Sequence, residues 1–542
     1  MRTRPAAQSS TAQRAADHGD SAGISTPAHP SINRTGLLLD ALLVTIVVVV
    51  AVLMRSRFIA AGPPTFVTPD SDDYLWPGYA LASGLGFDPE LRRTPLYPVF
   101  IAAVLAAGGN LATLAVVQHG LGVVTAALTY AMGRAAFGPV VGRAAGLLAG
   151  LMSALSGALI VYEHYLMSEA LFTLVLTLAL LLLVVALRRP TTRWLLLAGA
   201  GVALAGLTRP IGQAIVPLAL GLPVLLALPV WRVGLVRAAT VAAGFALVFA
   251  PWTVRNLAVH GTTGAEGALG QALIGRTVRH DGGYLFDDPA HPDPDPTRAA
   301  VRRIIQQEAD GGEPSGGTVT ARVRDELGLS EAQTSNILRA VALAEIAERP
   351  GHYLFTTREM AWELFQGRNE RLLGNWRART TRNWDKRWDA RIVTLLDPDR
   401  PAEGDAYERA DAVTSFYQPW RWRWPISWLF ALGAIMVLVV PRFRPALAPV
   451  GAALVLVVAA AALDGLVWRF RYPADPAIAV VAAGGLFAPL ALVWSAAVRY
   501  RLARGGQERA DADGPPSLEG DTDAGSVERG ASGRRIDGVV SR

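Results

Sequence analysis

The sequence predicts an all-α polytopic membrane protein with about ten transmembrane helices. About half of the chain is apolar, and the apolar residues recur in long runs from Leu37 onward. A run of roughly 18 apolar residues is long enough to cross a bilayer as a helix. The net charge of +6 is scattered over the short loops between these runs, a distribution typical of membrane proteins. These observations exclude a soluble enzyme and a nucleic-acid-binding protein.

The apolar runs place the spans in chain order. They are 37–54, 111–132, 140–160, 168–187, 194–207, 211–230, 233–251, 425–440, 446–467 and 477–498. The first run is too long for a signal-peptide core, so we expect a retained helix. The stretch 93–107 is apolar but short and contains two prolines. We expect it to be re-entrant or interfacial rather than an eleventh span.

Arginine clusters predict the orientation of these spans. With ten spans, the even-numbered loops carry most of the clustered arginines: Arg134, Arg143, Arg188, Arg189, Arg193, Arg232, Arg237, Arg442 and Arg444. All of them fall on one side if the spans alternate. The positive-inside rule assigns this side to the cytoplasm, so we expect both termini on the cytoplasmic side of the cell membrane.

The remaining segments complete the predicted domain organisation. We expect disordered cytoplasmic tails at 1–36 and 500–542. Between them we expect a transmembrane catalytic module at 37–252, with its first external loop at 55–110. An extracytoplasmic insert at 253–423 and the C-terminal transmembrane helices at 424–499 would follow. Within the insert, Ser330 and Gln333 fit a capping box that opens a helix, and Pro350 begins a second helical stretch. The Gly- and Asp-rich stretch 280–296 is predicted to be a mobile loop. Tryptophans interleaved with arginines over 376–424 are expected at the membrane interface.

Acidic side chains beside the apolar runs are candidates for chemistry, because charge near a membrane span is costly. Asp70, Asp72 and Asp73 follow the first span, and Glu163, His164 and Glu169 lie on the same predicted side. A carboxylate there can accept a proton from an acceptor hydroxyl or bind a divalent cation. The plainer alternatives are a solvated acidic loop and, for Glu169, a favourable interaction with the helix dipole.

Arginines occur on the same external side, against the positive-inside trend. They are Arg93, Arg209, Arg255, Arg469 and Arg471. Guanidinium groups bind phosphate through paired hydrogen bonds, so an anionic substrate would explain them; snorkelling of side chains at helix ends is the alternative. The chain has no cysteine, so any metal, such as Mg²⁺ or Mn²⁺, would be held by oxygen ligands.

Short motifs in a fixed order resemble the GT-C superfamily of polytopic glycosyltransferases, in particular the family 39-like branch of protein O-mannosyltransferases and lipid A aminoarabinose transferases. The motifs are Asp70-Ser71-x-x-Tyr74, Gly84-x-Gly86, Arg93-x-Pro95-x-Tyr97-Pro98, Ser168-Glu169-Ala170-Leu171-Phe172, Leu207-Thr208-Arg209-Pro210, Pro251-Trp252-x-x-Arg255-Asn256 and Arg471-Tyr472-Pro473. The resemblance covers the membrane part well and reaches the insert only at 350–354.

The resemblance implies a polyprenyl-phosphate sugar donor, an acceptor outside the cytoplasmic membrane, and a catalytic aspartate at Asp70 in the first external loop. Glu169 matches the acidic position of the second external loop. The residues expected to bind substrate are Asp72, Asp73, Tyr74, Arg93, Tyr97, Glu163, His164, Arg209, Arg255, Asn256, Arg469 and Arg471. Members that use a metal would hold it at positions such as Asp70 and Glu169. The family often has Asp-Glu where this chain has Asp70-Ser71, so Asp72 or Asp73 would have to supply any second carboxylate.

Two other readings stay open from the sequence. A polytopic transporter or lipid flippase would also have many helices and interfacial charges, although the hydropathy has no obvious inverted repeat. A polymerase or ligase of the cell envelope would use the same class of lipid-linked substrate. A phosphate-loop ATPase is disfavoured because its Gly-x4-Gly-Lys-Ser/Thr motif does not occur. The sugar and the acceptor, whether protein, lipid or glycan, are not encoded in any recognisable pattern.

Overall fold

The computed structural model describes residues 34–63, 65–87, 93–261, 263–264, 269–280, 294–311, 316–367, 396, 406–415 and 423–512. Within these ranges every regular element is a helix, and one isolated bridge pairs Phe66 with Tyr165. The all-α prediction is confirmed. Residues 281–293 of the predicted loop 280–296 and most of the Trp- and Arg-rich stretch 376–424 lie outside the described residues.

Long apolar helices form the body of the molecule. Among the described residues, six helical segments are long and apolar enough to cross a membrane, or seven if one bent pair counts as a span. They are α1 (Arg34–Ala60), α4 (Leu111–Phe137), α7 (Glu169–Arg188), α10 (Trp231–His260), α20 (Leu447–Leu463) with the preceding turn η3 (Pro441–Ala446), and α21 (Asp475–Ala512) with the turns before it; the bent pair is α5 (Val141–Leu155) and α6 (Gly157–Glu163). A multi-pass membrane fold is therefore confirmed.

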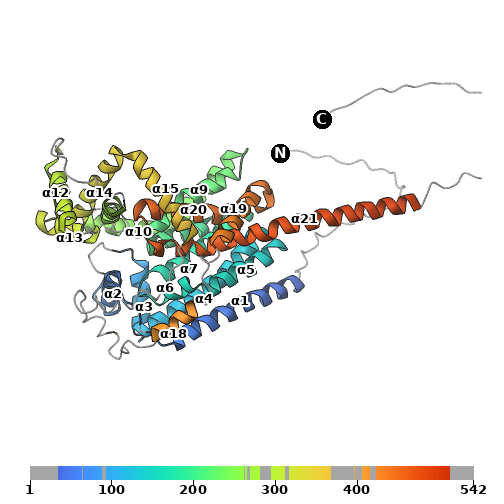
Figure 1. Ribbon diagram of the computed structural model, residues 1–542, viewed down its shortest axis with the longest axis horizontal. Helices are drawn as coiled ribbons and strands as arrows, with labels where there is room; N and C mark the ends of the chain where they lie inside the picture. The colour runs from blue at the N-terminus through green and yellow to red at the C-terminus, as the bar shows by residue number, and fades with distance from the viewer. Residues whose placement is uncertain are drawn as a thin grey trace, which may run out of the picture.

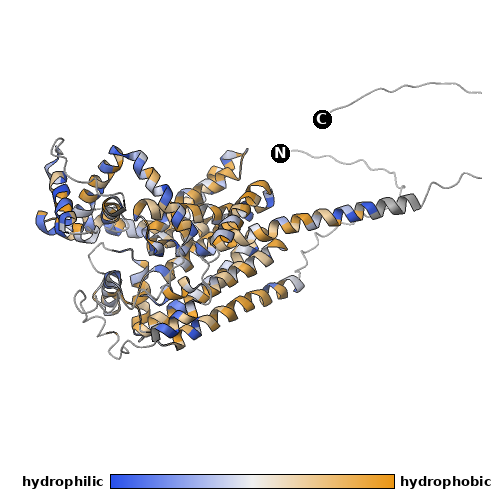
Figure 2. Cartoon of the chain, in the orientation of Figure 1, coloured by the Kyte–Doolittle hydropathy of each residue, from blue (hydrophilic) through white to orange (hydrophobic). Residues whose placement is uncertain are grey.

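Shorter apolar helices occupy the other predicted spans. They are α8 (Thr192–Thr208), α9 (Val216–Leu225) after the 3-10 turn η1 (Pro210–Ile215), and α19 (Arg423–Val439). The count of ten spans stays a prediction, because these helices are shorter than a bilayer-spanning helix normally is. Figure 2 shows that the helices in the middle of the molecule are mostly hydrophobic, whereas hydrophilic segments gather at one end and on the far part of α21.

Two helices form in the segment 55–110, which the sequence predicts to be the first external loop. Thr68 and Ser71 form a capping box that opens α2 (Pro69–Ala82), with Pro69 in the first turn, where its missing N–H costs nothing. α3 (Leu96–Ala106) follows and packs against α2. At 11 residues α3 is about 16 Å long, about half the thickness of a bilayer core. A helix of this length is too short to cross the bilayer by itself, which agrees with the prediction that 93–107 is interfacial or re-entrant.

Arginines predicted to share one side of the membrane meet at one end of the helices. The Asp40 carboxylate accepts hydrogen bonds from Arg134 at 3.1 Å and Arg143 at 2.8 Å, and also from the Tyr130 hydroxyl. Arg188 reaches the carbonyl oxygens of Ala136 and Arg442, at 2.6 and 3.3 Å. Asp40 lies in the first turns of α1, and the loop that leads to α2 leaves from the other end of that helix. The 27 residues of α1 span about 40 Å, so this arginine cluster lies a membrane thickness away from α2.

The insert builds its own small helical unit. α11 (Leu269–His280), α12 (Pro296–Gly311), α13 (Gly316–Leu327) and α14 (Glu331–Glu348) share an apolar core that includes Ile274, Val301, Val323 and Leu338. The capping box at Ser330 and Gln333 opens α14 as predicted, and α15 (Pro350–Gln366) begins at Pro350. α15 packs against α20, which joins the insert to the membrane helices. α12–α14 lie at the same end of the molecule as α2 and α3, and α21 projects from the opposite end (Figure 1).

Two further segments complete the described chain. α18 (Ala406–Thr414) lies against α1 and α6, where Arg409 donates to the carbonyl of Ala61. Gly157 permits this contact, because a Cβ there would lie 2.1 Å from the Thr414 carbonyl oxygen. α21 continues to Ala512, so the first part of the segment predicted to be a C-terminal tail is helical.

Candidate functional site

Asp70 occupies the first turn of α2, where it bridges two arginines from distant parts of the chain. Its Oδ1 lies 2.9 Å from Nη2 of Arg93, and its Oδ2 lies 2.6 Å from Nη1 of Arg469. The side chain is 30% exposed. The N-terminus of a helix favours a carboxylate, and the capping box fixes the direction in which this turn begins. The first external loop and the segment before the last helix therefore meet at one carboxylate.

Arg93 is shared between two aspartates and an aromatic ring. Its Nη2 lies 2.9 Å from Oδ2 of Asp73 as well as from Asp70, and its guanidinium stands over the Tyr74 ring at 5.0 Å. The Tyr74 hydroxyl lies 3.2 Å from Oγ of Ser168. Asp72 lies on the same turn of α2 as these aspartates. Arg93 therefore contacts three residues that were predicted to belong to the site, Asp70, Asp73 and Tyr74.

A second pair of arginines, Arg209 and Arg469, contacts one aromatic ring beside Asp70. The Phe470 ring has the guanidinium groups of Arg209 and Arg469 at 4.8 and 5.0 Å from its centre. Arg209 also lies 2.5 Å from Oε1 of Glu169, the first residue of α7, whose side chain is 2% exposed. We name the residues Asp70, Asp73, Tyr74, Arg93, Glu169, Arg209 and Arg469 the Asp70 cluster. Seven of the predicted site residues therefore come together.

The charge of Asp70 is strongly stabilised. Burial acts to raise the pKa of its carboxyl group, but the charges of Arg469 and Arg93, and more weakly Arg209, outweigh burial and lower the pKa to about 2. Asp70 is therefore ionised at any physiological pH. In this state it holds two guanidinium groups, one on each carboxylate oxygen.

Sequence reasoning missed Asp464, the residue that ends α20. Burial raises the pKa of Asp464, while Arg469, Arg209 and Arg93 act to lower it and Asp70 acts to raise it. All four neighbours belong to the Asp70 cluster, so Asp464 lies within its electrostatic field. The sequence did contain one signal. Asp464 is a carboxylate at the end of an otherwise apolar run, next to Gly465, and it precedes Arg469 by five positions.

Glu163 and His164 belong to a different, buried network. Glu163 pairs with Arg55 at 2.5 Å and with Nδ1 of His119 at 3.0 Å, and the other ring nitrogen of His119 lies 3.2 Å from His164. All four side chains are at least 94% buried. Gly122 makes room for this network, because a Cβ there would lie 1.9 Å from Oε1 of Glu163. Both predicted residues thus have internal partners rather than places in the Asp70 cluster.

The polar contacts in this network form a continuous chain. It runs from Glu163 through both imidazole rings to the carbonyl oxygen of Pro63. The tautomers of the two histidines decide which ring nitrogens donate.

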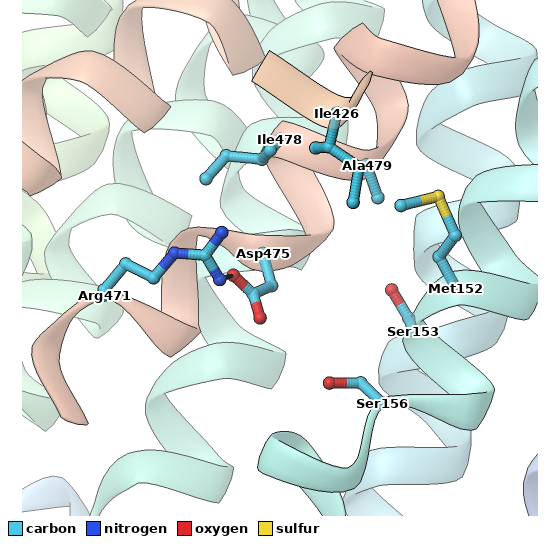
Figure 3. A pocket seen from close by; sticks show the side chains of 8 residues that line it. All are labelled: Met152, Ser153, Ser156, Ile426, Arg471, Asp475, Ile478 and Ala479. Carbon is cyan, nitrogen blue, oxygen red and sulfur yellow. Dashed lines mark hydrogen bonds and ion pairs between the residues drawn. The ribbon is translucent and has the colours of Figure 1, made fainter. Parts of the chain in front are cut away.

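Arg471 also lies apart from the Asp70 cluster. It forms a buried ion pair with Asp475, one helical turn along, at the start of α21. The two side chains line a small cavity of about 20 Å³ together with Ser153, Ser156, Met152 and three apolar residues of α19 and α21 (Figure 3). This space suits a water molecule rather than a sugar. The phosphate contact predicted for Arg471 is replaced here by an internal partner.

The other predicted residues have structural partners as well. Arg255 stacks on the Trp252 ring at 4.7 Å and on Phe87 at 5.4 Å, which ties the end of α10 to the first external loop. Asn256 is fully buried and donates to the carbonyl of Gly264. Tyr97 is likewise buried; its ring packs edge-on against Tyr74, and its hydroxyl donates to Gln118 at 2.7 Å. Tyr97 therefore supports the site from behind.

The donor set of the Asp70 cluster does not fit a divalent cation. Asp70 is held by two guanidinium groups and Glu169 by a third, so a dication would have to displace them against their positive charge. Within the described ranges, no group of three or more His, Asp or Glu side chains is arranged to hold a metal ion. The cluster instead presents guanidinium groups, which are suited to a phosphate.

Comparison with known proteins identifies a related family for part of the chain. Residues 92–254 match the family described as dolichyl-phosphate-mannose-protein mannosyltransferase. This match confirms the resemblance to GT-C glycosyltransferases over the region that contains Arg93, Glu169 and Arg209. Asp70 and Arg469 lie outside the matched residues. No curated protein matches the sequence.

The chain is also similar to solved structures at low sequence identity, including these two. One is the archaeal oligosaccharyltransferase AglB from Archaeoglobus fulgidus in complex with an inhibitory peptide and a dolichol-phosphate, with 12% identity and a TM-score of 0.43 over 86% of this chain and 52% of that protein. The other is ArnT from Cupriavidus metallidurans bound to undecaprenyl phosphate, with 14% identity and a TM-score of 0.31 over 84% of this chain and 79% of that protein. The chain thus spans about half the length of the oligosaccharyltransferase.

Proposed function

We propose that this protein is a membrane glycosyltransferase that moves a sugar from a polyprenyl-phosphate donor to an acceptor outside the cytoplasmic membrane. The observation that carries the proposal is the junction of Arg93 and Arg469 on Asp70. It combines two phosphate-binding groups with a carboxylate in the first external loop. The matched mannosyltransferase family adds support over residues 92–254, which include Arg93 but neither Asp70 nor Arg469.

The two arginines are the proposed phosphate site. Each has one terminal nitrogen on Asp70. A guanidinium group has five N–H donors and always carries a positive charge, so a phosphate could share these two groups with Asp70. A donor phosphodiester would lie between them, and Arg209, whose guanidinium also contacts the Phe470 ring, would add a third positive charge. Cationic donors fixed before the reaction stabilise the charge that develops on a leaving phosphate.

Asp70 is the proposed general base. The acceptor hydroxyl oxygen attacks the anomeric carbon of the sugar, and the bond from that carbon to the phosphate oxygen breaks. The electron pair leaves with the lipid phosphate, which gains one negative charge, and the hydroxyl proton moves to the carboxylate. Asp70 is a weak base while it faces two arginines. A bound phosphate would share those arginines, raise the pKa of Asp70, and make it a better proton acceptor in the loaded site.

The insert is the proposed boundary of the acceptor site. α15 packs on α20, whose end carries Asp464, and α11 reaches the same end through Arg276. An acceptor approaching from the external side would meet this unit before the Asp70 cluster. The orientation follows from the arginines around Asp40, which the positive-inside rule assigns to the cytoplasm. Both termini would then be cytoplasmic and the Asp70 cluster external.

A transfer assay in nanodiscs tests this proposal. Purified protein receives a panel of radiolabelled polyprenyl-phosphate sugars, with a membrane and cell-wall extract as the source of acceptors. We expect one donor to label a product with the wild type and not with Asp70→Asn. Failure of every donor with verified folded protein would contradict the transferase proposal and favour a transporter or flippase.

A further inference from the structure

Phe470 is an aromatic side chain that two arginines of the Asp70 cluster share. It ends the 3-10 turn η4 (Trp468–Phe470), where its amide donates to the Val467 carbonyl at 3.1 Å. The guanidinium carbons of Arg209 and Arg469 lie 4.8 and 5.0 Å from the centre of its ring. The two positive charges are therefore close together and repel each other. Holding them side by side requires a group that attracts both.

The ion pairs of these arginines do not supply such a group. Nη1 of Arg469 lies 2.6 Å from Oδ2 of Asp70, whereas Nη1 of Arg209 lies 2.5 Å from Oε1 of Glu169. The two carboxylates belong to different helices, α2 and α7, so each pair directs its arginine to a separate partner. The face of an aromatic ring attracts guanidinium groups. The Phe470 ring thus offsets the repulsion at the point where the two arginines meet.

Arg469 depends on the ring for the orientation of its guanidinium group. Besides Asp70, its Nη1 has the Met167 sulfur at 4.0 Å, and a thioether is a weak acceptor. Within the described ranges, Nε of Arg469 is buried and has no hydrogen-bond partner. A planar group held by one strong contact can turn about that contact, and a ring beside it restricts the turn. Loss of the ring would therefore loosen Arg469 without breaking its ion pair.

The insert holds the ring in place. Phe470 packs against a small apolar core that joins α15 to α20 and consists of Leu364, Val457, Ala460 and Ala461. The same core is contacted by Ile211, two positions after Arg209. One apolar cluster therefore supports the ring and the turn that carries Arg209.

The insert also fixes the backbone that leads to the ring. Arg276 of α11 donates to the Ala461 carbonyl at 2.8 Å, and the Tyr353 hydroxyl of α15 donates to the Ala462 carbonyl at 2.6 Å. The last carbonyls of a helix lack intrahelical partners, so these two donors secure the end of α20. The turn η4 begins a few residues later. Its position is therefore set from the insert side.

We propose that Phe470 is a positioning residue of the donor-phosphate site, whose ring keeps Arg209 and Arg469 together so that both bind one anion. This inference rests on the proposed function, since it assumes that the anion is the phosphate of a polyprenyl lipid. Groups that are fixed before binding lose less conformational freedom when the ligand arrives. The ring thus increases donor affinity without contacting the sugar or the phosphate.

The test measures lipid binding rather than transfer. The probe is undecaprenyl methyl phosphate, and its dissociation constant is measured in nanodiscs for the wild type, Phe470→Leu and Phe470→Tyr. Leucine keeps an apolar side chain on the core of α15 and α20 but has no aromatic face. We expect Phe470→Leu to bind about tenfold more weakly and Phe470→Tyr, which keeps the ring, to stay within about threefold of the wild type. Thermal melting verifies folding, and Phe470→Met replaces the leucine variant if that variant does not fold.

Two controls separate positioning from packing. Phe365 of α15 packs against the same apolar core, and among the described residues its ring contacts are with Trp362 and Phe430. Phe365→Leu should therefore leave the dissociation constant unchanged. In an Arg469→Gln background, Phe470→Leu should lose most of its effect, because the ring acts through the arginines.

Each other outcome overturns a defined part of the reasoning. A folded Phe470→Leu that binds like the wild type, or an equal weakening in Phe470→Tyr or Phe365→Leu, would remove the positioning role from Phe470. If the Phe470 effect is found but no sugar donor supports transfer, the proposed function is wrong and the inference about the phosphate site stands. If the wild type does not bind the phosphodiester lipid, both are wrong.

Discussion

Replacing Asp70 with Asn keeps the size and shape of the side chain and removes the charge that Arg93 and Arg469 share. The substitution has two effects, which can be measured separately as a change in transfer rate and a change in stability and donor binding. The first is the loss of a base, and general-base groups contribute about 10²- to 10⁴-fold to rate. The second is the loss of an anchor for two arginines, which affects stability and donor binding. We expect the first effect to dominate the transfer rate.

The stability effect can be worked from the pKa of Asp70. A shift from 3.8 to about 2 corresponds to about 2 kcal/mol in favour of the ionised form. Solvent around a side chain that is 30% exposed reduces this toward about 1 kcal/mol. Because the pKa is lowered in the folded state, this contribution is complete above the unfolded value and is lost as pH falls from about 4 to 2. At neutral pH the variant should therefore melt only a few degrees lower.

Asp40→Asn is the matched control. It also removes a carboxylate held by two arginines, Arg134 and Arg143, but at the opposite end of α1. Both variants are compared with the wild type in single-turnover transfer with the donor that the panel identifies. We expect Asp70→Asn to lose at least about 10²-fold in rate and Asp40→Asn to stay within about threefold of the wild type. A folded Asp70→Asn with nearly wild-type turnover would refute the base assignment.

Three further predictions concern the surroundings of Asp70. Arg469→Gln should raise the donor KM by about tenfold or more and leave the acceptor KM unchanged, because a charge-assisted hydrogen bond to phosphate is worth roughly 1.5–3 kcal/mol; an equal change in both constants would contradict a phosphate contact. Gly122→Ala should lower the melting temperature strongly, since the new methyl group would meet Glu163; Gly120→Ala, with open space at its Cβ position, is the control. Arg471→Ala should destabilise the protein by about 3–5 kcal/mol because it leaves Asp475 buried without its partner, and an Asp475→Asn second substitution should recover part of that loss in thermal melting.

The membrane helices could be predicted from the sequence because their signal is local. Runs of apolar residues predicted α1, α4 and α7 directly, and the capping box at Ser330 predicted the start of α14. The number of spans was harder to derive, since α8, α9 and α19 are short and the span at α5 is bent by 52°. Whether such helices cross a bilayer depends on how they tilt and pack, which hydropathy does not encode.

The site could be predicted only in part, because residue type does not reveal partners. Asp70 and Arg93 were found through motifs and Arg469 as an arginine on the predicted external side, and the structure brings them together. Glu163 and Arg471 have the same residue types at similar predicted depth, but each has a buried counter-ion inside the protein. For Glu163 the decisive partner is Arg55, more than 100 positions away. Asp464 was missed because it belongs to no motif, and the arginines that influence its pKa come from separate segments of the chain.

The buried network and the Asp70 cluster are connected through one short segment. The Gln118 amide donates to the carbonyls of Glu163 and Tyr165, and its own oxygen accepts from Tyr97. Three residues beyond Tyr165, the chain places Ser168 against the Tyr74 hydroxyl. A reacting group on a loop needs support that holds it within a fraction of an ångström. The ion pairs of Glu163 therefore act on the Asp70 cluster without contacting substrate, by fixing the backbone that presents Ser168 to α2.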